Sequence, residues 1–200
     1  MSHLKMKFFS LYHFHRTDLR IDLSAHLRGE KYMQIGRHFC AGRGLCMEAI
    51  DEWKPPQGVQ RFHPSIVIGD NVNLSDYVHI GCVNKIIIGD FVLMGSKIYI
   101  TDHNHGVYKG TNQDSPDLPP IRRQLTAGQA VIIENNVWLG DNVVVMPGVT
   151  IGHGSIIGSL SVVTHDVPPE CIAVGSPARV IKYWNDARQM WENVNQKIQK

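Results

Sequence analysis

Aliphatic residues recur at every sixth position through two long stretches of the chain. The repeat runs over residues 68–100, with a slip of two residues inside that range, and again over residues 133–163. A helix has about 3.6 residues per turn and disfavours Gly, Asn and β-branched residues, so the repeat does not fit a helix. It predicts short strands that each point one aliphatic side chain inward. The repeat positions are Ile68, Leu74, Ile80, Ile88, Met94, Ile100, Ile133, Leu139, Val145, Ile151, Ile157 and Val163.

The residues between the aliphatic positions favour tight corners. Glycine follows the aliphatic residue at Gly140, Gly152 and Gly158, and Asn and Asp are frequent nearby. These residues adopt the corner conformations that other residues resist. Each hexapeptide is then one side of a prism, and the coils stack into a parallel β-helix. A β-sandwich of many short strands is the alternative, but sandwiches do not hold one exact period through six repeats.

The N-terminal residues follow the repeat less closely. Ile35, Ala41 and Met47 again fall six residues apart, which indicates an early coil. A stack of coils needs caps, because an open end exposes the core and unpaired strand edges. We therefore expect residues 1–60 to form a cap region with an early coil, and residues 61–182 to form the β-helix domain.

The residues after the repeat have a helical pattern. Apolar side chains fall at three- and four-residue spacings, as on one face of a helix. We expect a helix over residues 183–200 that packs its aromatic side chains on the coils or on a neighbouring subunit. The apolar positions are Tyr183, Trp184, Ala187, Met190, Trp191 and Val194.

Composition narrows the class of protein. The 200 residues are 43% hydrophobic and 19% charged, which suits one globular domain with a buried core. A formal net charge of +2 and the absence of basic runs argue against a nucleic-acid partner. No eighteen-residue apolar run or signal-peptide pattern is present, so a cytoplasmic location is the default expectation. The four cysteines have no zinc-site spacing and are expected to be free thiols.

The interruption between the two repeats is the best candidate for chemistry. Residues 101–130 form a polar, proline-containing loop, and so long a loop in a compact repeat protein is usually functional or disordered. A histidine near its start suits a general base, because its unperturbed pKa lies near neutrality. The alternative is that His103 and His105 only hydrogen-bond the backbone, and the residues alone do not decide between these roles. The loop begins Thr101-Asp102-His103-Asn104-His105-Gly106.

These features together resemble the hexapeptide-repeat acyltransferases, and most of all the bacterial lipopolysaccharide O-antigen O-acetyltransferases. Galactoside and maltose acetyltransferases are similar more broadly. The likeness extends from about residue 60 to 195 and implies an all-β, left-handed parallel β-helix with an extruded loop. It also implies a homotrimer that binds acetyl-CoA in the groove between subunits. The motifs that carry it are the two repeats, residues 101–106, Val137-Trp138-Leu139-Gly140 and Gly175-Ser176-Pro177-Ala178-Arg179-Val180-Ile181.

The resemblance assigns roles to residues in and beside the loop. His103 stands where the family has its general base, with His105 as the alternative. Asp141 matches a residue whose backbone N–H faces the thioester carbonyl, and its side chain varies in the family. Trp138 matches a tryptophan that lines the groove, although a packed coil residue would also explain it.

Further contacts with acetyl-CoA are implied for the later coils. Ser159 stands where the family has Ala or Gly against the pantetheine, which is a mild departure. Thr164 and His165 match a Thr-Lys pair, and the missing lysine removes one expected phosphate contact. Arg179 and Lys182 match basic residues near the nucleotide end of CoA.

The histidines of this region do not predict a metal site. His79 would add a third imidazole, but the spacing of His79, His103 and His105 does not resemble the three-histidine zinc site of the gamma-class carbonic anhydrases. No Glu or Asp close in the sequence completes a ligand set. We expect no metal.

The predicted activity is direct transfer of acetyl from acetyl-CoA to a sugar hydroxyl of a surface polysaccharide (O-antigen or capsule) or its precursor. A lipid-linked acceptor would bring the trimer to the inner membrane face without an anchor of its own. The alternatives are a free saccharide, an aminosugar nitrogen or an antibiotic as acceptor. A non-catalytic β-helix scaffold is a further alternative.

Overall fold

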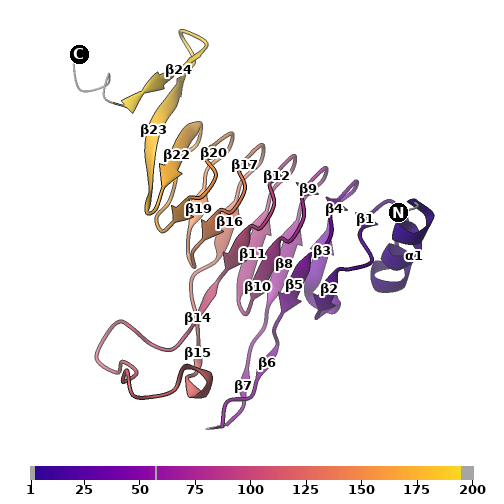
Figure 1. The fold of residues 1–200 in the computed structure, drawn as a ribbon, viewed down its shortest axis with the longest axis vertical. Coiled ribbons are helices and arrows are strands. Elements are labelled where there is room, and N and C mark those ends of the chain that lie inside the picture. Colours follow the sequence, from indigo (N-terminus) through magenta and orange to yellow (C-terminus); the bar gives the residue numbers. More distant parts are fainter. Residues whose placement is uncertain (1–2, 57, 195–200) are drawn as a thin grey trace.

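A computed structural model describes residues 3–56 and 58–194, most of which lie in one stack of coils (Figure 1). Each coil passes through three sheets, named faces A, B and C, whose coil strands pair in parallel. Face A contains β1 (Arg20–Ile21), β4 (Cys40–Ala41), β9 (Asn73–Leu74), β12 (Leu93–Met94), β17 (Trp138–Leu139), β20 (Ile156–Ile157) and β22 (Cys171–Gly175). Face B contains β2 (His26–Arg28), β5 (Cys46–Ala49), β10 (His79–Cys82), β13 (Tyr99–Thr101), β18 (Val144–Val145) and β21 (Val162–Val163). Face C contains β3 (Met33–Ile35), β8 (Ser65–Ile68), β11 (Lys85–Ile88), β16 (Val131–Ile133) and β19 (Thr150–Ile151).

The aliphatic residues of the repeat fill the inside of the prism. All of the repeat positions predicted to point inward are at most 4% exposed. They also stack in register, because Ile80 lies opposite Ile100 on the next coil and Ile100 lies opposite Val145 on the one after. Burying one such side chain stabilises the fold by about 1.5–3 kcal/mol. The predicted parallel β-helix is confirmed, and it is left-handed.

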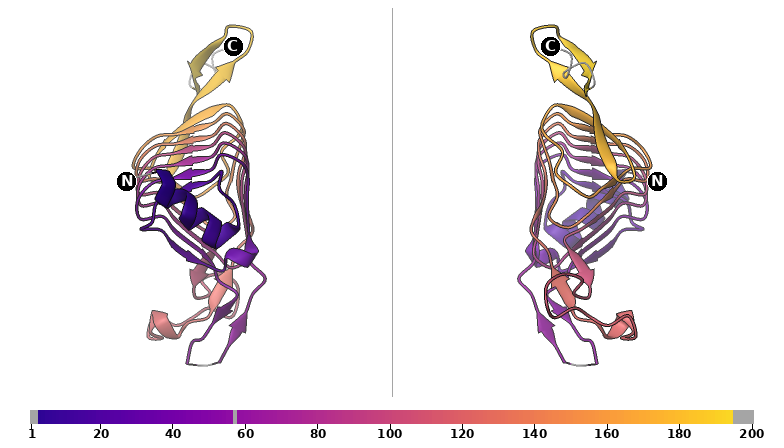
Figure 2. Two further views of the ribbon diagram at one scale, coloured as in Figure 1. Left: turned by 90° about the vertical axis from the view of Figure 1, so that its right-hand side faces the viewer. Right: turned by 90° about the vertical axis from the view of Figure 1, so that its left-hand side faces the viewer.

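Side chains from one coil hold the corners of the coil before it. The Oδ1 atom of Asp90 accepts the backbone N–H of Asp70 at 2.7 Å, and Oδ1 of Asn135 accepts the N–H of Asp90 at 2.8 Å. Only glycine fits beside such a contact at residue 89, since a Cβ on Gly89 would lie 2.2 Å from Asn135 Oδ1. In consequence the corners of successive coils lie over one another, as the end-on views in Figure 2 show.

The stack begins earlier in the chain than the sequence analysis placed it. Strand β1 already pairs in parallel with β4, so the residues from Arg20 onward belong to the coils. Ile21, Leu27 and Met33 continue the six-residue spacing there, although Leu27 is only partly buried. Helix α1 (His3–Phe14) covers the open end, and Oγ of the buried Ser10 lies 3.2 Å from the carbonyl oxygen of Leu19. Among the described residues, no helix has the length and apolar character needed to cross a membrane.

The helix predicted for residues 183–200 is wrong over its described part. Strand β23 (Ala178–Asn185) turns back antiparallel on β22, and β24 (Met190–Asn193) pairs antiparallel with β23. The sheet therefore takes the backbone hydrogen bonds that a helix would need. Trp184 and Trp191 lie directly opposite each other with ring centroids 5.4 Å apart, a cross-strand aromatic pair of the kind that stabilises strands. Residues 195–200 lie outside the described residues.

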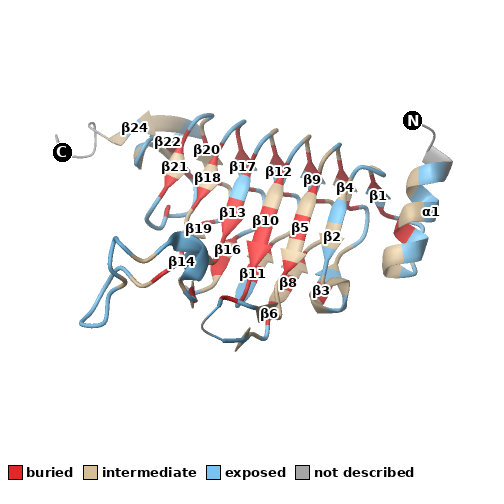
Figure 3. Cartoon of the chain, turned by 60° about the horizontal axis from the view of Figure 1, so that its bottom comes forward, coloured by how far each residue is buried: buried red, intermediate tan, exposed pale blue. Residues whose placement is uncertain are grey.

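Two segments project from the same edge of the stack (Figure 1). The first, called the hairpin, consists of residues 51–56 and 58–62 and contains β6 (Glu52–Trp53) and β7 (Gln60–Arg61). The second, called the arm, consists of residues 102–128 and contains β14 (His103–His105), the 3₁₀ turn η2 (Pro120–Arg122) and β15 (Leu125–Ala127). Another 3₁₀ turn, η1 (Glu30–Tyr32), lies between β2 and β3. Figure 3 shows that the arm is largely exposed, unlike the strands of the coils.

Candidate active site

His103 lies at the base of the arm, where the chain leaves the stack. Strand β13 ends at Thr101 on face B, and the chain would next turn the corner into face C. Instead β14 pairs antiparallel with β15, with His103 opposite Ala127. The base of the arm is closed by Gly128, whose N–H donates to the carbonyl oxygen of Asp102 at 2.7 Å. The His103 side chain is only 10% exposed. The stack therefore fixes the position of this histidine, although it belongs to the arm.

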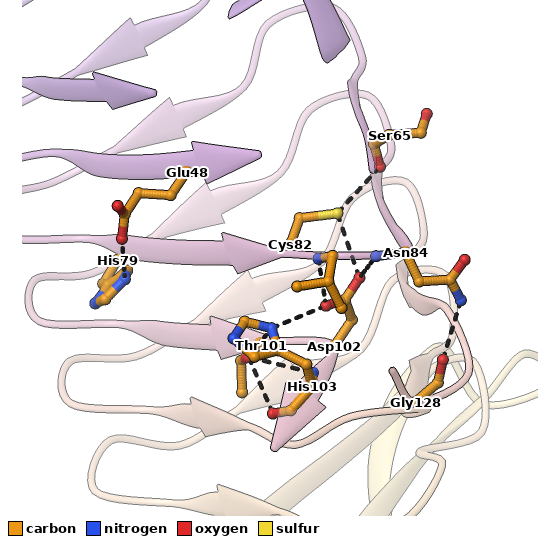
Figure 4. A network of polar contacts seen from close by, with 10 residues as sticks. Glu48, Ser65, His79, Cys82, Asn84, Thr101, Asp102, His103 and Gly128 are labelled. Carbon is orange, nitrogen blue, oxygen red and sulfur yellow. Dashed lines mark hydrogen bonds and ion pairs between the residues drawn. The ribbon is translucent and has the colours of Figure 1, made fainter. Parts of the chain in front are cut away.

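A buried carboxylate holds the His103 ring (Figure 4). Asp102 is 0% exposed, and its Oδ1 lies 3.1 Å from His103 Nδ1. The same carboxylate accepts the backbone N–H groups of Val83 at 2.9 Å and Asn84 at 2.8 Å. Thr101 Oγ1 is also 3.1 Å from Nδ1. With a proton on Nδ1 facing Asp102, Nε2 is the nitrogen with a lone pair for a substrate proton.

The hydrogen bonds keep Asp102 ionised despite its burial. Burial acts to raise the pKa of Asp102, but hydrogen bonds from His103, Val83 and Asn84 outweigh it and hold the pKa below its usual value. A buried charge of this kind is stable only when its partners satisfy it. A negative Asp102 beside the imidazole can in turn stabilise the imidazolium that forms when His103 takes a proton.

Cys82 contributes a neutral donor to this network. Its Sγ lies 3.3 Å from Asp102 Oδ2 and 3.5 Å from the carbonyl oxygen of Ser65. Burial first, and then the charge of Asp102, raise the pKa of the Cys82 thiol far above its usual value. The thiol therefore stays protonated, which makes it a poor nucleophile.

His105 has a different environment from His103. Its ring meets the edge of Trp53 in the hairpin, with centroids 5.2 Å apart. Burial first, and then the nearby His103, lower the pKa of His105. Among the described residues, no carboxylate hydrogen-bonds the His105 ring. The geometry of a general base with an orienting carboxylate is therefore present at His103 and not at His105.

Three of the residues expected to bind acetyl-CoA line one surface pocket of about 210 Å³ on face A and its corner with face B. The three are Trp138, Asp141 and Ser159, and the pocket is also lined by Ser75, Leu93 and Gly140. The Trp138 side chain is 49% exposed, so it lines the pocket and is not packed in the core. The sheet register extends the surface from Trp138 through Ile156 and Ile172 to Lys182 on adjacent strands.

The backbone N–H of Asp141 already has an acceptor. It donates to Ser159 Oγ at 3.1 Å, while the Asp141 carboxylate accepts the N–H of Ser96 at 2.6 Å. The Asp141 side chain is thus a corner bond between coils. Its N–H becomes available to a ligand only when the Ser159 hydroxyl moves away.

The remaining expected residues lie elsewhere on the stack. Thr164 and His165 follow β21 at the corner between faces B and C, where Thr164 Oγ1 lies 2.9 Å from His165 Nδ1. Arg179 lies on β23 opposite Val174. Thr164 and His165 therefore share the corner of His103, whereas the pocket of Trp138 and Asp141 borders face A.

In a single chain these two groups of residues do not meet. His103 leaves the stack where face B turns into face C, and Asp141 lies where face A turns into face B. The strands of face B separate the two corners. A site that uses both corners therefore needs a second copy of the chain.

Comparisons with known protein families and with known proteins place the chain in the same family. The family model described as "Bacterial transferase hexapeptide (six repeats)" matches residues 130–165. The chain is 38% identical to the Escherichia coli (strain K12) protein named "Putative lipopolysaccharide biosynthesis O-acetyl transferase WbbJ", over 90% of this chain and 86% of that protein. It is 35% identical to the galactoside O-acetyltransferase of the same strain, over 67% of this chain and 62% of that protein.

A solved structure shares the fold. The crystal structure of AntD, an N-acyltransferase from Bacillus cereus in complex with dTDP and 3-hydroxybutyryl-CoA, superposes with a TM-score of 0.66. The superposition covers 91% of this chain and 86% of that one, at 20% sequence identity.

Proposed function

Because this chain belongs to the hexapeptide-repeat acetyltransferases, we propose that it transfers acetyl from acetyl-CoA to a sugar hydroxyl of a surface polysaccharide or its precursor. The acceptor class is that of an O-antigen or capsule. The observation that carries the proposal is the buried Asp102 carboxylate on His103 Nδ1, because a hydroxyl must lose its proton as it attacks.

His103 is the proposed general base. A sugar hydroxyl is a poor nucleophile at neutral pH, and His103 Nε2 takes its proton while the oxygen attacks the thioester carbonyl. The ionised Asp102 stabilises the imidazolium that results. When the tetrahedral intermediate collapses, the carbon–sulfur bond breaks and the same proton passes to the departing CoA sulfur. The proposed transfer is direct, because the buried, protonated Cys82 thiol beside Asp102 is a poor nucleophile for an acyl-enzyme.

The pocket at Asp141 is the proposed place of the thioester. The developing oxyanion needs a fixed donor, and the Asp141 N–H serves once it exchanges Ser159 Oγ for the thioester oxygen. Trp138 lies beside the pantetheine, with Arg179 and Lys182 nearer the nucleotide end. The base comes from a neighbouring copy, which also brings Thr164 and His165, and the proposed working unit is the homotrimer that the family resemblance implies.

The proposed acceptor site is a cavity on the arm that begins at Asn104, the residue after His103. It measures about 610 Å³ and lies between the arm and the next coil. Its wall mixes a cation, amides, a hydroxyl and an aromatic ring, which suits a sugar with many hydroxyl groups. Among the lining residues are Asn104, Tyr108, Lys109, Thr126 and Gln129. We place the reaction in the cytoplasm, with peripheral membrane contact only through a lipid-linked acceptor.

An acceptor screen tests the proposal. The purified chain is incubated with acetyl-CoA and panels of nucleotide-linked sugars, free saccharides, aminosugars and antibiotics, and free thiol release is followed with His103→Ala as the blank. We expect release with a hydroxyl acceptor and loss of it in the variant. Turnover only with an amino acceptor would contradict the O-acetyl assignment.

A scaffold function is tested by ligand binding. A ligand that binds the folded state raises the melting temperature, so CoA should shift the unfolding transition. The Trp138→Ala variant should lose most of this shift, because it removes a half-exposed wall of the pocket. No shift of the wild-type chain at millimolar CoA would favour the scaffold.

A further inference from the structure

A second cluster of polar side chains lies on the outer surface of face B, on the coils before the arm. The sheet register places His26 of β2 opposite Cys46 of β5, and Cys46 opposite His79 of β10. Glu48 follows Cys46 by two residues, so both side chains leave the same side of β5. Three successive coils thus present imidazole, thiol and carboxylate groups to one spot.

The Glu48 carboxylate is the common neighbour of the cluster. Its oxygens lie 3.6 Å from His79 Nε2, 3.8 Å from His26 Nε2 and 3.9 Å from Cys46 Sγ. The ligating atoms of Cys46, Glu48 and His79 all lie within 4.8 Å of one another. Figure 4 shows Glu48 and His79 facing each other from adjacent strands.

These separations are close to those in a zinc site. Two ligands that each lie about 2.0–2.3 Å from a tetrahedral zinc ion are about 3.3–3.8 Å apart. The three contacts of the Glu48 carboxylate fall at or just above that range. Cysteine, histidine and carboxylate are also the side chains that zinc takes as ligands, and magnesium and calcium do not share this preference for sulfur and nitrogen.

The surroundings favour an ion that arrives from solvent. The cluster is held on paired strands, so the ligands are positioned by the fold before any ion binds. The side chains of Glu48 and His79 are 23% and 41% exposed, which leaves a path for entry. The group differs from the His79, His103 and His105 set considered from the sequence, because its carboxylate lies 31 residues before His79.

We propose that Cys46, Glu48 and His79 bind a zinc ion, with His26 or a water molecule as the fourth ligand. The ion joins β5 to β10, and through His26 to β2, so it links the early coils of the stack. Zinc binding is measured separately from acetyl transfer, so the site stands whether or not the proposed reaction is correct.

Zinc titration of the full chain tests the site. The purified protein is stripped with a chelator, dialysed and titrated with zinc by calorimetry. We expect one zinc ion per chain and a rise in melting temperature, since zinc binds the folded state. Cys46→Ser and His79→Ala should each weaken binding by about tenfold or more. Cys40→Ser is the matched control, because Cys40 is also a half-buried free thiol but lies on β4 of face A, and it should bind as the wild type does.

Cobalt gives a second measurement that does not depend on stability. Cobalt bound in place of zinc should show the near-ultraviolet absorption of a thiolate ligand, and this absorption should vanish in Cys46→Ser but persist in Cys40→Ser. The proposal is overturned if the wild type takes up no zinc at micromolar concentrations. It is equally overturned if Cys46→Ser binds zinc with wild-type affinity, in which case the cluster is an ion-pair network only.

Discussion

The carboxylate of Asp102 decides which nitrogen of His103 is able to take a proton. It occupies the Nδ1 side of the ring from a fully buried position, and two backbone N–H groups from the preceding coil hold it there. Nε2 is therefore the nitrogen available for the proposed role as base, and the ring has little freedom to turn away. This argument separates His103 from His105, whose ring contacts Trp53 instead.

Removal of the imidazole at residue 103 should abolish most of the activity. We expect His103→Ala to lower kcat by roughly 10²–10⁴, the usual contribution of a general base. His105→Ala is the control and should keep kcat within about tenfold of the wild type, because His105 lacks an orienting carboxylate. Steady-state rates with the acceptor found in the screen measure both. A larger loss in His105→Ala than in His103→Ala would reverse the assignment.

The lowered pKa of Asp102 predicts a loss of stability in acid. Since the folded chain holds this proton less tightly than the unfolded chain, the stabilisation is complete above the unfolded pKa of about 3.9. It disappears as the pH falls through the lower, folded pKa. Urea unfolding at a series of pH values from neutral to 3 should show this decline. Asp102→Asn should lack that part of the decline, and an identical pH profile in both proteins would contradict the shift.

The hydrogen bond from Asp141 N–H to Ser159 Oγ predicts that removing the Ser159 hydroxyl should raise activity. Ser159→Ala removes the internal acceptor, so the N–H no longer has to exchange partners before it meets the thioester oxygen. A neutral hydrogen bond contributes about 0.5–1.5 kcal/mol, so kcat/KM should rise by up to about tenfold. Thr164→Ala, at the other corner, should show no rise. A fall in kcat/KM for Ser159→Ala would mean that the hydroxyl itself binds acetyl-CoA.

Single residues of the site were only partly predictable from the sequence. His103 was found because a polar run interrupts a regular repeat. Asp102 stood next to it, but its role depends on Val83 and Asn84, which lie 19 and 18 residues earlier and meet it only in the folded stack. The Ser159 contact is hidden in the same way, since it joins two successive coils.

The Gln60 side chain hydrogen-bonds the hairpin to the arm. Gln60 Nε2 donates to the carbonyl oxygen of Leu125 at 3.1 Å, and Gln60 Oε1 accepts the N–H of Leu125 at 2.8 Å. The amide thus pairs with β15 as a neighbouring strand would. The arm carries the wall of the proposed acceptor cavity, so this contact positions that wall.

Loss of the Gln60 contact should loosen the arm without unfolding the stack. Gln60→Ala should speed limited proteolysis within residues 107–123 and raise KM for the acceptor by a few-fold, while the melting temperature changes little. Arg61→Ala is the control, because its side chain is exposed on the same hairpin. Equal proteolysis of Gln60→Ala and the wild type would show that the clamp does not restrain the arm.

The elements themselves show where sequence patterns succeed and fail. A period of six is specific to stacked coils, so each repeat position fell inside the prism. Aromatic and apolar residues at the C-terminal end have a spacing that fits both a helix face and a cross-strand pair; they are Tyr183, Trp184, Met190 and Trp191. These residues form strands because β22 offers its free edge to β23, which pairs in turn with β24. The earliest coil was missed because the repeat there covers only Ile21, Leu27 and Met33 and slips by two residues before Ile35.

At the scale of the whole molecule, the stack separates the two halves of the proposed site. His103, Thr164 and His165 follow face B, whereas Trp138, Asp141 and Ser159 lie on face A and the corner before face B. The rigidity of the coils prevents one chain from bringing these corners together. The central claim is therefore that each site joins His103 of one chain to the pocket of its neighbour.

Mixed assemblies test this claim most directly. His103→Ala removes the base, and Ser159→Trp fills the pocket with a large side chain at an exposed position. The two variants, each inactive alone, are co-expressed with different tags, and assemblies that carry both tags are assayed for acetyl transfer. If base and pocket come from neighbouring chains of a trimer, each assembly that carries both tags regains one of its three sites, or about one third of the wild-type activity. Mixed assemblies that are intact yet inactive would contradict the account.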